Sequence, residues 1–273
     1  MKKIIFAISI ILLFLAITTS TLWGKFALVE KKEVEVALTP VPTNVPPDIN
    51  EIMEKVKGNH IPILMYHCVA NEPTTSLTEL FVKPSDLEKQ LKYLQKKGYQ
   101  TLTFEDLVNI EKYDKPVLLT FDDGYRDNYT ELFPILKKYK AKATIFVIAD
   151  NFKKSNFLNE KQVKRMIDSG YVSIQSHTKS HKGLKDVKDD KLLKEELGKS
   201  KKLIEKVTNK PVIVVAYPNG ESNKKVQKVA SKYYDYALNK NGGTFICGED
   251  LYTMSRSRVS RSTSLKEFKK LVK

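Results

Sequence analysis

The sequence predicts an α/β fold in which short strands and longer helices alternate from about residue 60 to the C-terminus. Apolar runs of strand length recur at residues 61–66, 117–121, 143–148, 172–175 and 212–217. Stretches with helical start and stop signals separate these runs. Repetition of strand and helix in this number favours a barrel of parallel strands in a single domain.

The helices are predicted from apolar spacing and from caps. Residues 84–97 place Leu87, Leu91 and Leu94 on one face, and Gly98 follows as a stop. Ser264 and Glu267 form a capping-box pattern for a last helix. A strand-like segment at 255–260 precedes it. The other helices are expected at residues 103–109, 127–139, 159–170, 189–207 and 223–233.

Two polar clusters follow predicted strands and carry the chemistry. Asp122, Asp123 and Gly124 come directly after the strand at 117–121, and His177 and His181 come after the strand at 172–175. Alone, Asp-Asp-Gly is typical of a turn, and a His pair can simply be solvated. Together at strand ends, where α/β folds build their sites, they indicate a divalent metal held by one carboxylate and two imidazoles. The second carboxylate is then free to act as a base.

A metal site of this kind is suited to hydrolysis. A metal with open positions polarises a carbonyl and lowers the pKa of a bound water to about 7. Two His and one carboxylate form an established set for catalytic zinc, and the same set also serves iron and other divalent metals. We therefore expect a divalent cation, with Zn²⁺ first and Co²⁺, Ni²⁺ or Fe²⁺ as alternatives.

Five segments of the chain match a known family pattern: ILMYH (63–67), TFDDGYRDNY (120–129), FPILKKYKAKATIFV (133–147), SHTKSH (176–181) and AYPNG (216–220). Through these segments the chain resembles the polysaccharide deacetylase family, whose members are metal-dependent carbohydrate esterases with a NodB-homology domain. The resemblance covers roughly residues 61–272 and is closest to the branch that acts on poly-N-acetylglucosamine and cell-wall glycans. It implies a distorted (β/α) barrel of about seven strands.

The resemblance also implies roles for the polar residues. It makes Asp123, His177 and His181 the metal ligands and Asp122 the general base. His67 falls where this branch places its general acid, although a His closing an apolar strand can equally be a hydrogen-bonded core residue. Imidazole titrates near pH 6.5, so His67 could be protonated while Asp122 stays ionised.

The segment from Ala216 to Gly220 corresponds to a family motif that usually ends in Pro-Tyr. The resemblance makes the backbone N–H of Asn219 an oxyanion donor beside Pro218 and Tyr217. The change from Tyr to Asn puts the contact to the sugar in doubt, because a backbone donor survives a change of side chain. Many relatives carry an Arg at the position of Ala216 that steadies the base. Arg256 or Arg258 could replace it, and Arg258 fits the family's late Arg-x-Val pattern better.

The N-terminal region indicates export. Lys2 and Lys3 precede an unbroken apolar run at residues 4–17, as in a signal peptide. With residues 18–24 the segment is long enough to span a bilayer, and no clear cleavage site follows. We expect residues 1–24 to be a signal-anchor in the cytoplasmic membrane, with a cleaved signal peptide as the alternative. Residues 25–59 read as a Pro-containing extracellular linker, and residues 60–273 as the catalytic domain. The enzyme would then lie on the outer face of the cell membrane or in the cell wall.

The formal net charge is +15, from 47 Lys and Arg against 32 Asp and Glu. Such an excess attracts polyanions. The expected export and the absence of a recognition motif argue against nucleic acid, so anionic cell-wall polymers are the better candidates. Two cysteines, Cys68 and Cys247, are too few to form a disulfide framework, and whether they pair is left open.

We therefore expect an N-deacetylase of an envelope glycan, either peptidoglycan or poly-N-acetylglucosamine. The alternatives are an O-acetyl esterase on xylan-like glycans and an inactive carbohydrate-binding module on the same fold. Loss of a ligand or of the base would mark the inactive module, and none is lost in this sequence.

Overall fold

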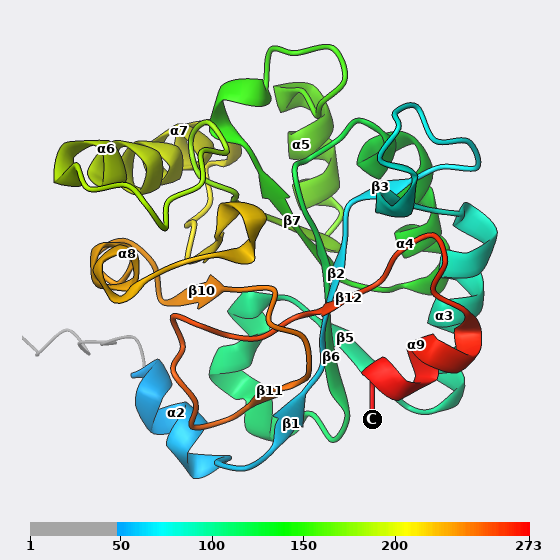
Figure 1. Ribbon diagram of the computed structural model, residues 1–273. Coiled ribbons are helices and arrows are strands. Elements are labelled where there is room, and N and C mark those ends of the chain that lie inside the picture. Colours follow the sequence, from blue (N-terminus) through cyan, green and yellow to red (C-terminus); the bar gives the residue numbers. More distant parts are fainter. Residues whose placement is uncertain (1–47) are drawn as a thin grey trace, which may run out of the picture. The chain divides into compact units, whose positions relative to one another are not determined.

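The computed structural model describes residues 48–273, and its centre is a curled, incompletely closed barrel of parallel strands (Figure 1). Each apolar run predicted above contributes a strand, and every neighbouring pair in the sheet is parallel. The predicted fold class is confirmed. The seven strands in spatial order are β10 (Tyr236–Leu238), β9 (Val214–Ala216), β8 (Val172–Ser176), β7 (Ala143–Val147), β6 (Pro116–Phe121), β2 (Ile63–Tyr66) and β12 (Ser257–Arg258).

Five short strands complete the sheet structure. The strand β5 (Gln100–Leu102) pairs with the first half of β6, and β7 pairs with the second half. The strand β1 (His60–Ile61) pairs antiparallel with β11 (Phe245–Ile246). The strand β3 (Cys68–Val69), directly after His67, pairs with β4 (Phe81–Val82).

Helices surround the sheet, with α3, α4 and α9 on one side in Figure 1 and α6, α7 and α8 on the other. The predicted caps are present: Asn159 caps α5, and Ser264 and Glu267 form the capping box of α9. The α-helices are α2 (Ile49–Lys55), α3 (Pro84–Lys96), α4 (Phe133–Tyr139), α5 (Glu160–Asp168), α6 (Asp190–Lys194), α7 (Ser200–Thr208), α8 (Lys224–Ala230) and α9 (Leu265–Leu271). The short helical turns are η1 (Thr78–Leu80), η2 (Phe104–Lys112), η3 (Asn128–Leu132), η4 (Ala149–Asn151), η5 (Glu195–Lys199) and η6 (Pro218–Gly220).

The strands separate two apolar layers because alternate side chains point to opposite faces. Leu64, Tyr66 and Phe121 belong to the layer beneath the helices, whereas Ile63 and Leu118 belong to the barrel interior. Counting on from Leu118 along β6, the next residues on the interior side are Thr120 and Asp122. This alternation decides which polar side chains can reach the interior of the barrel.

Several predicted elements have different bounds in the structure. The predicted strand at 61–66 is broken between β1 and β2, and the predicted helix at 189–207 is divided by the π-helical turn η5. The strands β5 and β10 were not predicted, because three residues are too few to show alternation. The short helix expected at 103–109 extends to Lys112 as η2.

The predicted linker extends to residue 59, but its last part is structured. Asp48 caps α2, and Ile52 and Met53 on that helix are buried in the interior apolar cluster. Residues 48–59 therefore pack with the barrel. The catalytic domain begins by residue 48, before the predicted end of the linker at residue 59. The predicted anchor at residues 1–24 and the rest of the linker, 25–47, lie outside the described residues. Among the helices within residues 48–273, none combines the length and apolar character needed to cross a bilayer.

Candidate active site

The polar residues predicted from the sequence gather at the carboxyl ends of the parallel strands. His67 follows β2, Asp122 and Asp123 follow β6, His177 follows β8, and Asn219 follows β9. Because the strands are parallel, these ends meet at one rim of the barrel. The residues line a single cleft of about 420 Å³. The strand-end residues named from the sequence therefore lie together at one rim of the barrel.

The predicted metal ligands form a compact group. One ligand atom each from Asp123, His177 and His181 lies within 4.8 Å of the others. The Asp123 Oδ1 atom is 3.5 Å from Nε2 of His177 and 3.5 Å from Nε2 of His181. Asp123 and His177 are buried, and His181 is half-buried. Three oxygen and nitrogen donors converge here on a space of the size that a cation fills.

The protonation of the histidines suits a cation. The Nδ1 atom of His177 lies 2.8 Å from the carbonyl oxygen of Ala216, so Nδ1 carries the proton and Nε2 keeps its lone pair toward Asp123. Burial lowers the pKa of both His177 and His181, which favours their neutral forms. Burial raises the pKa of Asp123. Without a cation, the lone pairs on Oδ1 of Asp123 and Nε2 of His177 would face and repel each other at 3.5 Å. A divalent metal between these atoms would remove the repulsion.

The backbone is strained where the ligands are held. Asp123 has φ of 72°, Thr178 of 63° and His181 of 63°, all in the left-handed region that side chains disfavour. Such residues cost about 1–3 kcal/mol each and cluster at functional sites. Gly124, with φ of 71°, could not carry a side chain, because a Cβ atom would lie 2.8 Å from Cγ1 of Val147. Both segments that carry the predicted metal ligands therefore hold a strained backbone.

Asp122, the predicted base, is paired with an arginine inside the barrel. Nη1 of Arg256 donates to Oδ1 of Asp122 at 2.7 Å, and Nη2 donates to Oδ2 at 2.8 Å. Arg256 also donates to Oγ1 of Thr120 and to the carbonyl oxygen of Asn239. Burial alone would raise the pKa of Asp122, but Arg256 and His177 outweigh it and hold that pKa well below its usual range. The carboxyl is therefore ionised at any working pH.

The prediction favoured Arg258 as the arginine beside the base, and this preference is wrong. Arg256 and Arg258 are two residues apart in an extended segment, so both side chains face the same side. The register of β12 against β2 sets Ser257 beside Leu64, which places Arg256 deeper in the barrel. Arg256 is 1 % exposed and reaches up to Asp122, whereas Arg258 is exposed at the cleft.

His67 lies in the cleft and is half-buried. Burial lowers its pKa to about 4, although the charge of Asp122 opposes the shift. The ring is therefore neutral near pH 7 in the free protein, whereas the sequence predicted an ordinary imidazole pKa. An imidazole with this pKa is a strong acid once it gains a proton.

Two residues that the sequence analysis did not select hold the segment around His67. Nδ2 of Asn128 donates to the carbonyl oxygen of His67 at 2.9 Å and to Oδ1 of Asp127 at 2.9 Å. The backbone N–H of Val69 donates to the same Asp127 oxygen at 3.0 Å. Oδ1 of Asn128 is buried without a partner, so the amide is oriented by its two donated bonds. Both residues lie in the TFDDGYRDNY segment, which was the available signal.

A tight turn follows β9 at the segment predicted to carry the oxyanion donor. Asn219 has φ of 59°, and the N–H of Gly220 closes the turn on the carbonyl oxygen of Tyr217 at 2.8 Å. Tyr217, Asn219 and Gly220 of this turn line the cleft, and Pro218 between them does not. The ring of Tyr217 packs in the apolar layer beneath the helices, and its hydroxyl is buried without a partner. Tyr217 thus contributes its backbone to this turn, and its ring is a core side chain.

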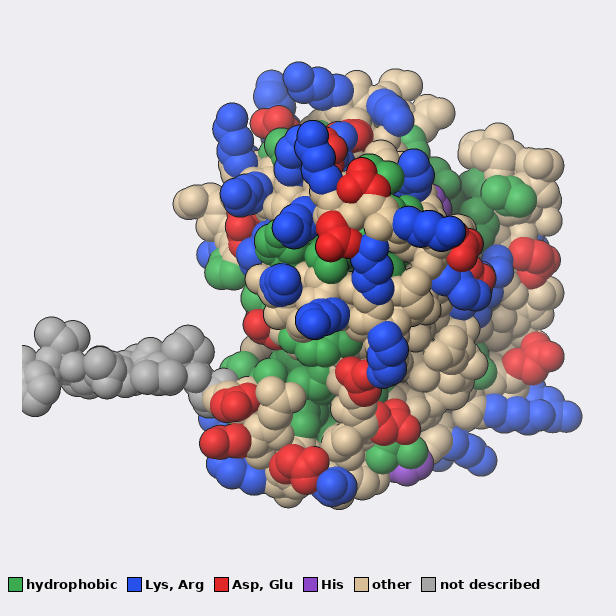
Figure 2. Space-filling view, turned by 60° about the vertical axis from the view of Figure 1, so that its left-hand side comes forward, with side chains coloured by type: hydrophobic (Ala, Val, Ile, Leu, Met, Phe, Trp, Pro, Cys, Tyr) green, Lys and Arg blue, Asp and Glu red, His purple; other side chains and the backbone are tan. Residues whose placement is uncertain are grey.

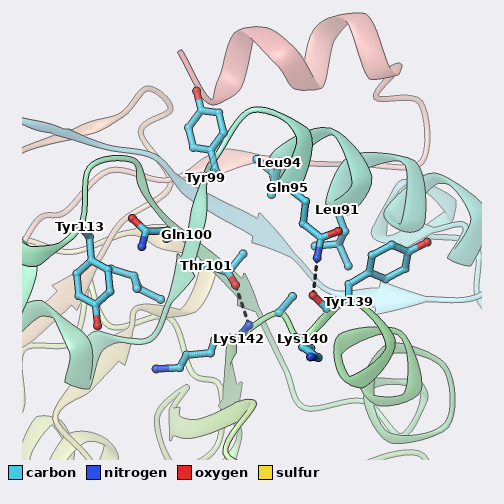
Figure 3. A pocket seen from close by; sticks show the side chains of 12 residues that line it. Leu91, Leu94, Gln95, Tyr99, Gln100, Thr101, Tyr113, Tyr139, Lys140 and Lys142 are labelled. Carbon is cyan, nitrogen blue, oxygen red and sulfur yellow. Dashed lines mark hydrogen bonds between the residues drawn. The ribbon is translucent and has the colours of Figure 1, made fainter.

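The remaining candidates lie outside this chemistry. Cys68 and Cys247 are both free and buried, and burial raises the pKa of each thiol. A second hollow of about 330 Å³ lies between α3, β5 and the start of β7 (Figure 3). Gln95 donates there to the carbonyl oxygen of Tyr139, and Thr101 accepts from the N–H of Lys142. It contains no carboxylate or histidine among its lining residues.

Comparison with known proteins agrees with this geometry. A family model described as polysaccharide deacetylase matches residues 109–236. The chain is 34 % identical over 223 residues to YxkH of Bacillus subtilis, which is named for the same family, and the match covers 80 % of this chain and 77 % of that protein. The chain belongs to the polysaccharide deacetylase family.

Other relatives refine this assignment. A poly-β-1,6-N-acetyl-D-glucosamine N-deacetylase of Staphylococcus aureus is 30 % identical over 182 residues, covering 60 % of this chain and 63 % of that protein. BC0361, a polysaccharide deacetylase of Bacillus cereus, superimposes with a TM-score of 0.75 at 38 % identity, covering 79 % of this chain and 69 % of that chain. The deacetylase PplD of Streptococcus pyogenes, solved with acetate, gives 0.74 at 30 % identity, covering 79 % and 99 %. The chain is an enzyme of this class, a polysaccharide deacetylase.

Proposed function

We propose that this enzyme removes N-acetyl groups from N-acetylglucosamine residues of a cell-envelope glycan, either poly-N-acetylglucosamine or peptidoglycan. The observation that carries the proposal is the pairing of two adjacent carboxylates with different environments. Asp122 is held ionised by Arg256, and Asp123 faces His177 and His181. The similarity to the S. aureus deacetylase supports the glycan class.

Asp123, His177 and His181 would hold the divalent cation, for which Zn²⁺ is our first choice. When bound, such a cation polarises a carbonyl and lowers the pKa of water to about 7. A weak base is then sufficient to take a proton from the water. The carboxylate of Asp122 is a weak base, because Arg256 keeps the pKa of Asp122 low. Each of its oxygens accepts one N–H of Arg256 and retains a second lone pair that can take a proton from the attacking water.

The other side of the cleft would serve the oxyanion and the leaving amine. The N–H of Asn219 donates to the acetyl oxygen as its negative charge develops. His67 is neutral in the free protein, and the proton that Asp122 takes from the water can pass to it, with the charge of Asp122 favouring the imidazolium. Its imidazolium, with a pKa of about 4, then protonates the amine nitrogen readily.

The test measures acetate release by the full-length chain from β-1,6-linked N-acetylglucosamine oligomers and from peptidoglycan fragments. Metal is removed with a chelator, its loss is confirmed, and Zn²⁺ is added back. We expect activity to disappear and return. Asp122→Asn should lose about 10²–10⁴-fold in rate, whereas Asp168→Asn on the exposed end of α5 should match the unaltered enzyme. Full activity after confirmed metal removal contradicts the proposal. Release of acetate only from O-acetylated xylan would indicate an esterase instead.

We further propose that residues 1–24 anchor the enzyme in the cytoplasmic membrane and that the barrel faces outward. The support is the charge and apolar pattern of that segment. Protease treatment of intact cells should degrade the barrel domain, and removal of residues 1–24 should keep it inside the cell. Protection from protease in intact cells, with degradation only after lysis, contradicts the outward orientation.

A further inference from the structure

The rim of the cleft carries three basic side chains that the proposed chemistry does not use. Lys154 follows β7, Lys240 follows β10, and Arg258 lies in β12; all three are exposed and line the cleft. In the described part of the chain none of the three takes part in an ion pair. They therefore remain available to a negative group on a substrate.

The residues lining the cleft have an excess of positive charge. With Arg256 there are four lysines and arginines against two carboxylates, Asp122 and Asp123. Both carboxylates are engaged, by Arg256 and by the two histidines. Glu79, whose carboxyl senses the charge of Arg258, is bonded to Oγ of Ser262 at 2.6 Å. A bound divalent cation would increase the positive excess further.

Lys240 is positioned by its contact with the oxyanion turn. Gly220 has φ of +63°, and a Cβ atom there would lie 2.4 Å from both Cβ and Cγ of Lys240. The stem of Lys240 thus lies directly on the backbone of Gly220, beside Asn219. This close approach keeps the lysine at the cleft, where a surface lysine would otherwise be free to turn away.

We propose that the cleft selects N-acetylated glycans that carry carboxylate or phosphate groups close to the acetamido group that is hydrolysed. This inference rests on the proposed function and narrows its substrate class to anionic glycans. Elsewhere, lysines also gather over the face that α6, α7 and α8 present in Figure 2, so an anionic polymer would meet positive charge outside the cleft as well.

The product of the reaction strengthens the argument. Each hydrolysed acetamide leaves an amine, a part of which is protonated and positively charged near pH 7. On a neutral polymer, successive turnovers would create a cationic chain that the basic rim repels. On an anionic polymer, the existing carboxylates or phosphates offset those new charges, and the polymer remains a substrate.

The experiment compares matched substrates of the full-length, metal-loaded enzyme. The first pair is an oligosaccharide of N-acetylglucosamine and N-acetylmuramic acid with free carboxylates, and the same oligosaccharide after methyl esterification. A phosphate-bearing N-acetylglucosamine polymer tests the other source of charge, and a β-1,6-linked N-acetylglucosamine oligomer is the neutral reference. We expect kcat/KM for an anionic glycan to exceed that for its neutral counterpart about tenfold at low salt. The difference should shrink between about 10 mM and about 1 M salt, as the Debye length falls from about 30 Å to about 3 Å.

Charge-removing variants locate the effect. An exposed ion pair contributes about 0.2–1 kcal/mol, so Lys154→Gln and Lys240→Gln should each lower kcat/KM for the anionic glycan by about 1.5- to 5-fold, with a smaller loss on the ester. Lys96→Gln removes the same charge from the exposed end of α3, outside the cleft, and should change neither value. Equal rates on the free acid and the ester at low salt overturn this inference and leave the deacetylase proposal standing. If no glycan releases acetate, both this inference and the deacetylase proposal are overturned. If the variant that combines Lys154→Gln and Lys240→Gln prefers the anionic glycan over its ester as strongly as the parent does, the assignment of the preference to these two lysines is overturned.

Discussion

Arg256 and Asp122 form a bidentate ion pair that is almost completely shielded from solvent. The side chains are 1 % and 4 % exposed, and the two N–O distances are 2.7 Å and 2.8 Å. Arg256 also binds Thr120 and Asn239, so its position is fixed independently of Asp122. The pair therefore orients the carboxylate of Asp122 from below while its remaining lone pairs stay available in the cleft.

Arg256→Gln should destabilise the protein strongly, because it leaves the buried charge of Asp122 without a counter-charge. Breaking a buried pair in this way costs about 3–5 kcal/mol. Arg258→Gln is the matched control two residues away, and its exposed side chain should change the free energy of unfolding by less than about 0.5 kcal/mol. Urea unfolding of the three proteins at pH 7 measures both values. Equal losses in the two variants would mean that the buried pair does not stabilise the fold.

Asp122→Asn and Asp123→Asn should separate the base from the ligand. The Asp122 variant should retain its metal and lose about 10²–10⁴-fold in kcat, because general-base assistance has that magnitude. The Asp123 variant should lose metal, since Oδ1 of Asp123 lies 3.5 Å from both histidine Nε2 atoms. Metal content after dialysis and acetate release are measured on the same samples, with circular dichroism to confirm folding. If metal content fell equally in both variants, the assignment of Asp122 as the base and Asp123 as the ligand would be wrong.

The strand-end residues could be predicted because parallel strands bring their carboxyl ends together whatever the details of packing. His67, Asp122 and His177 are each the first residue after a strand in the barrel. The choice between Arg256 and Arg258 could not be made from sequence. It depends on the register that sets Ser257 beside Leu64, and a two-residue strand does not reveal its register.

The side-chain partners of the site were beyond prediction for a similar reason. Tyr217 follows β9 in the same manner as the catalytic candidates, but alternation turns its ring to the layer beneath the helices. Asn128 contacts the backbone of His67 across 61 positions in the chain. Such contacts depend on how far η3 approaches β3 in three dimensions, which local sequence patterns do not encode.

Asp127 provides a test by pH. Burial raises its pKa to about 6, above the value of about 3.9 for an unfolded Asp. The folded state thus binds the proton more tightly, so this contribution to stability is complete below about pH 4 and is lost as the pH rises through about 6. Asp127→Asn removes the titrating charge while its side-chain oxygen can still accept the N–H of Val69. The variant should be more stable than the parent by about 3 kcal/mol at pH 8, and the difference should vanish near pH 4. A pH-independent difference would show that the carboxyl is not responsible.

His67 is best tested through the leaving group. His67→Ala should reduce hydrolysis of an acetamide by about 10²–10⁴-fold, the range for general acid catalysis. An activated aryl acetate should be affected far less, since an aryl oxide departs without a proton whereas an amine does not. Asn128→Leu, which removes the bond to the carbonyl oxygen of His67, should show the same selective loss in weaker form, because it displaces the acid without deleting it. The measurement is the ratio of kcat/KM on the two substrates for each variant, with metal content held equal. Equal losses on both substrates would make His67 a positioning residue. Of the other histidines, His177 and His181 are the proposed metal ligands, and His60 lies in β1, outside the residues that line the cleft.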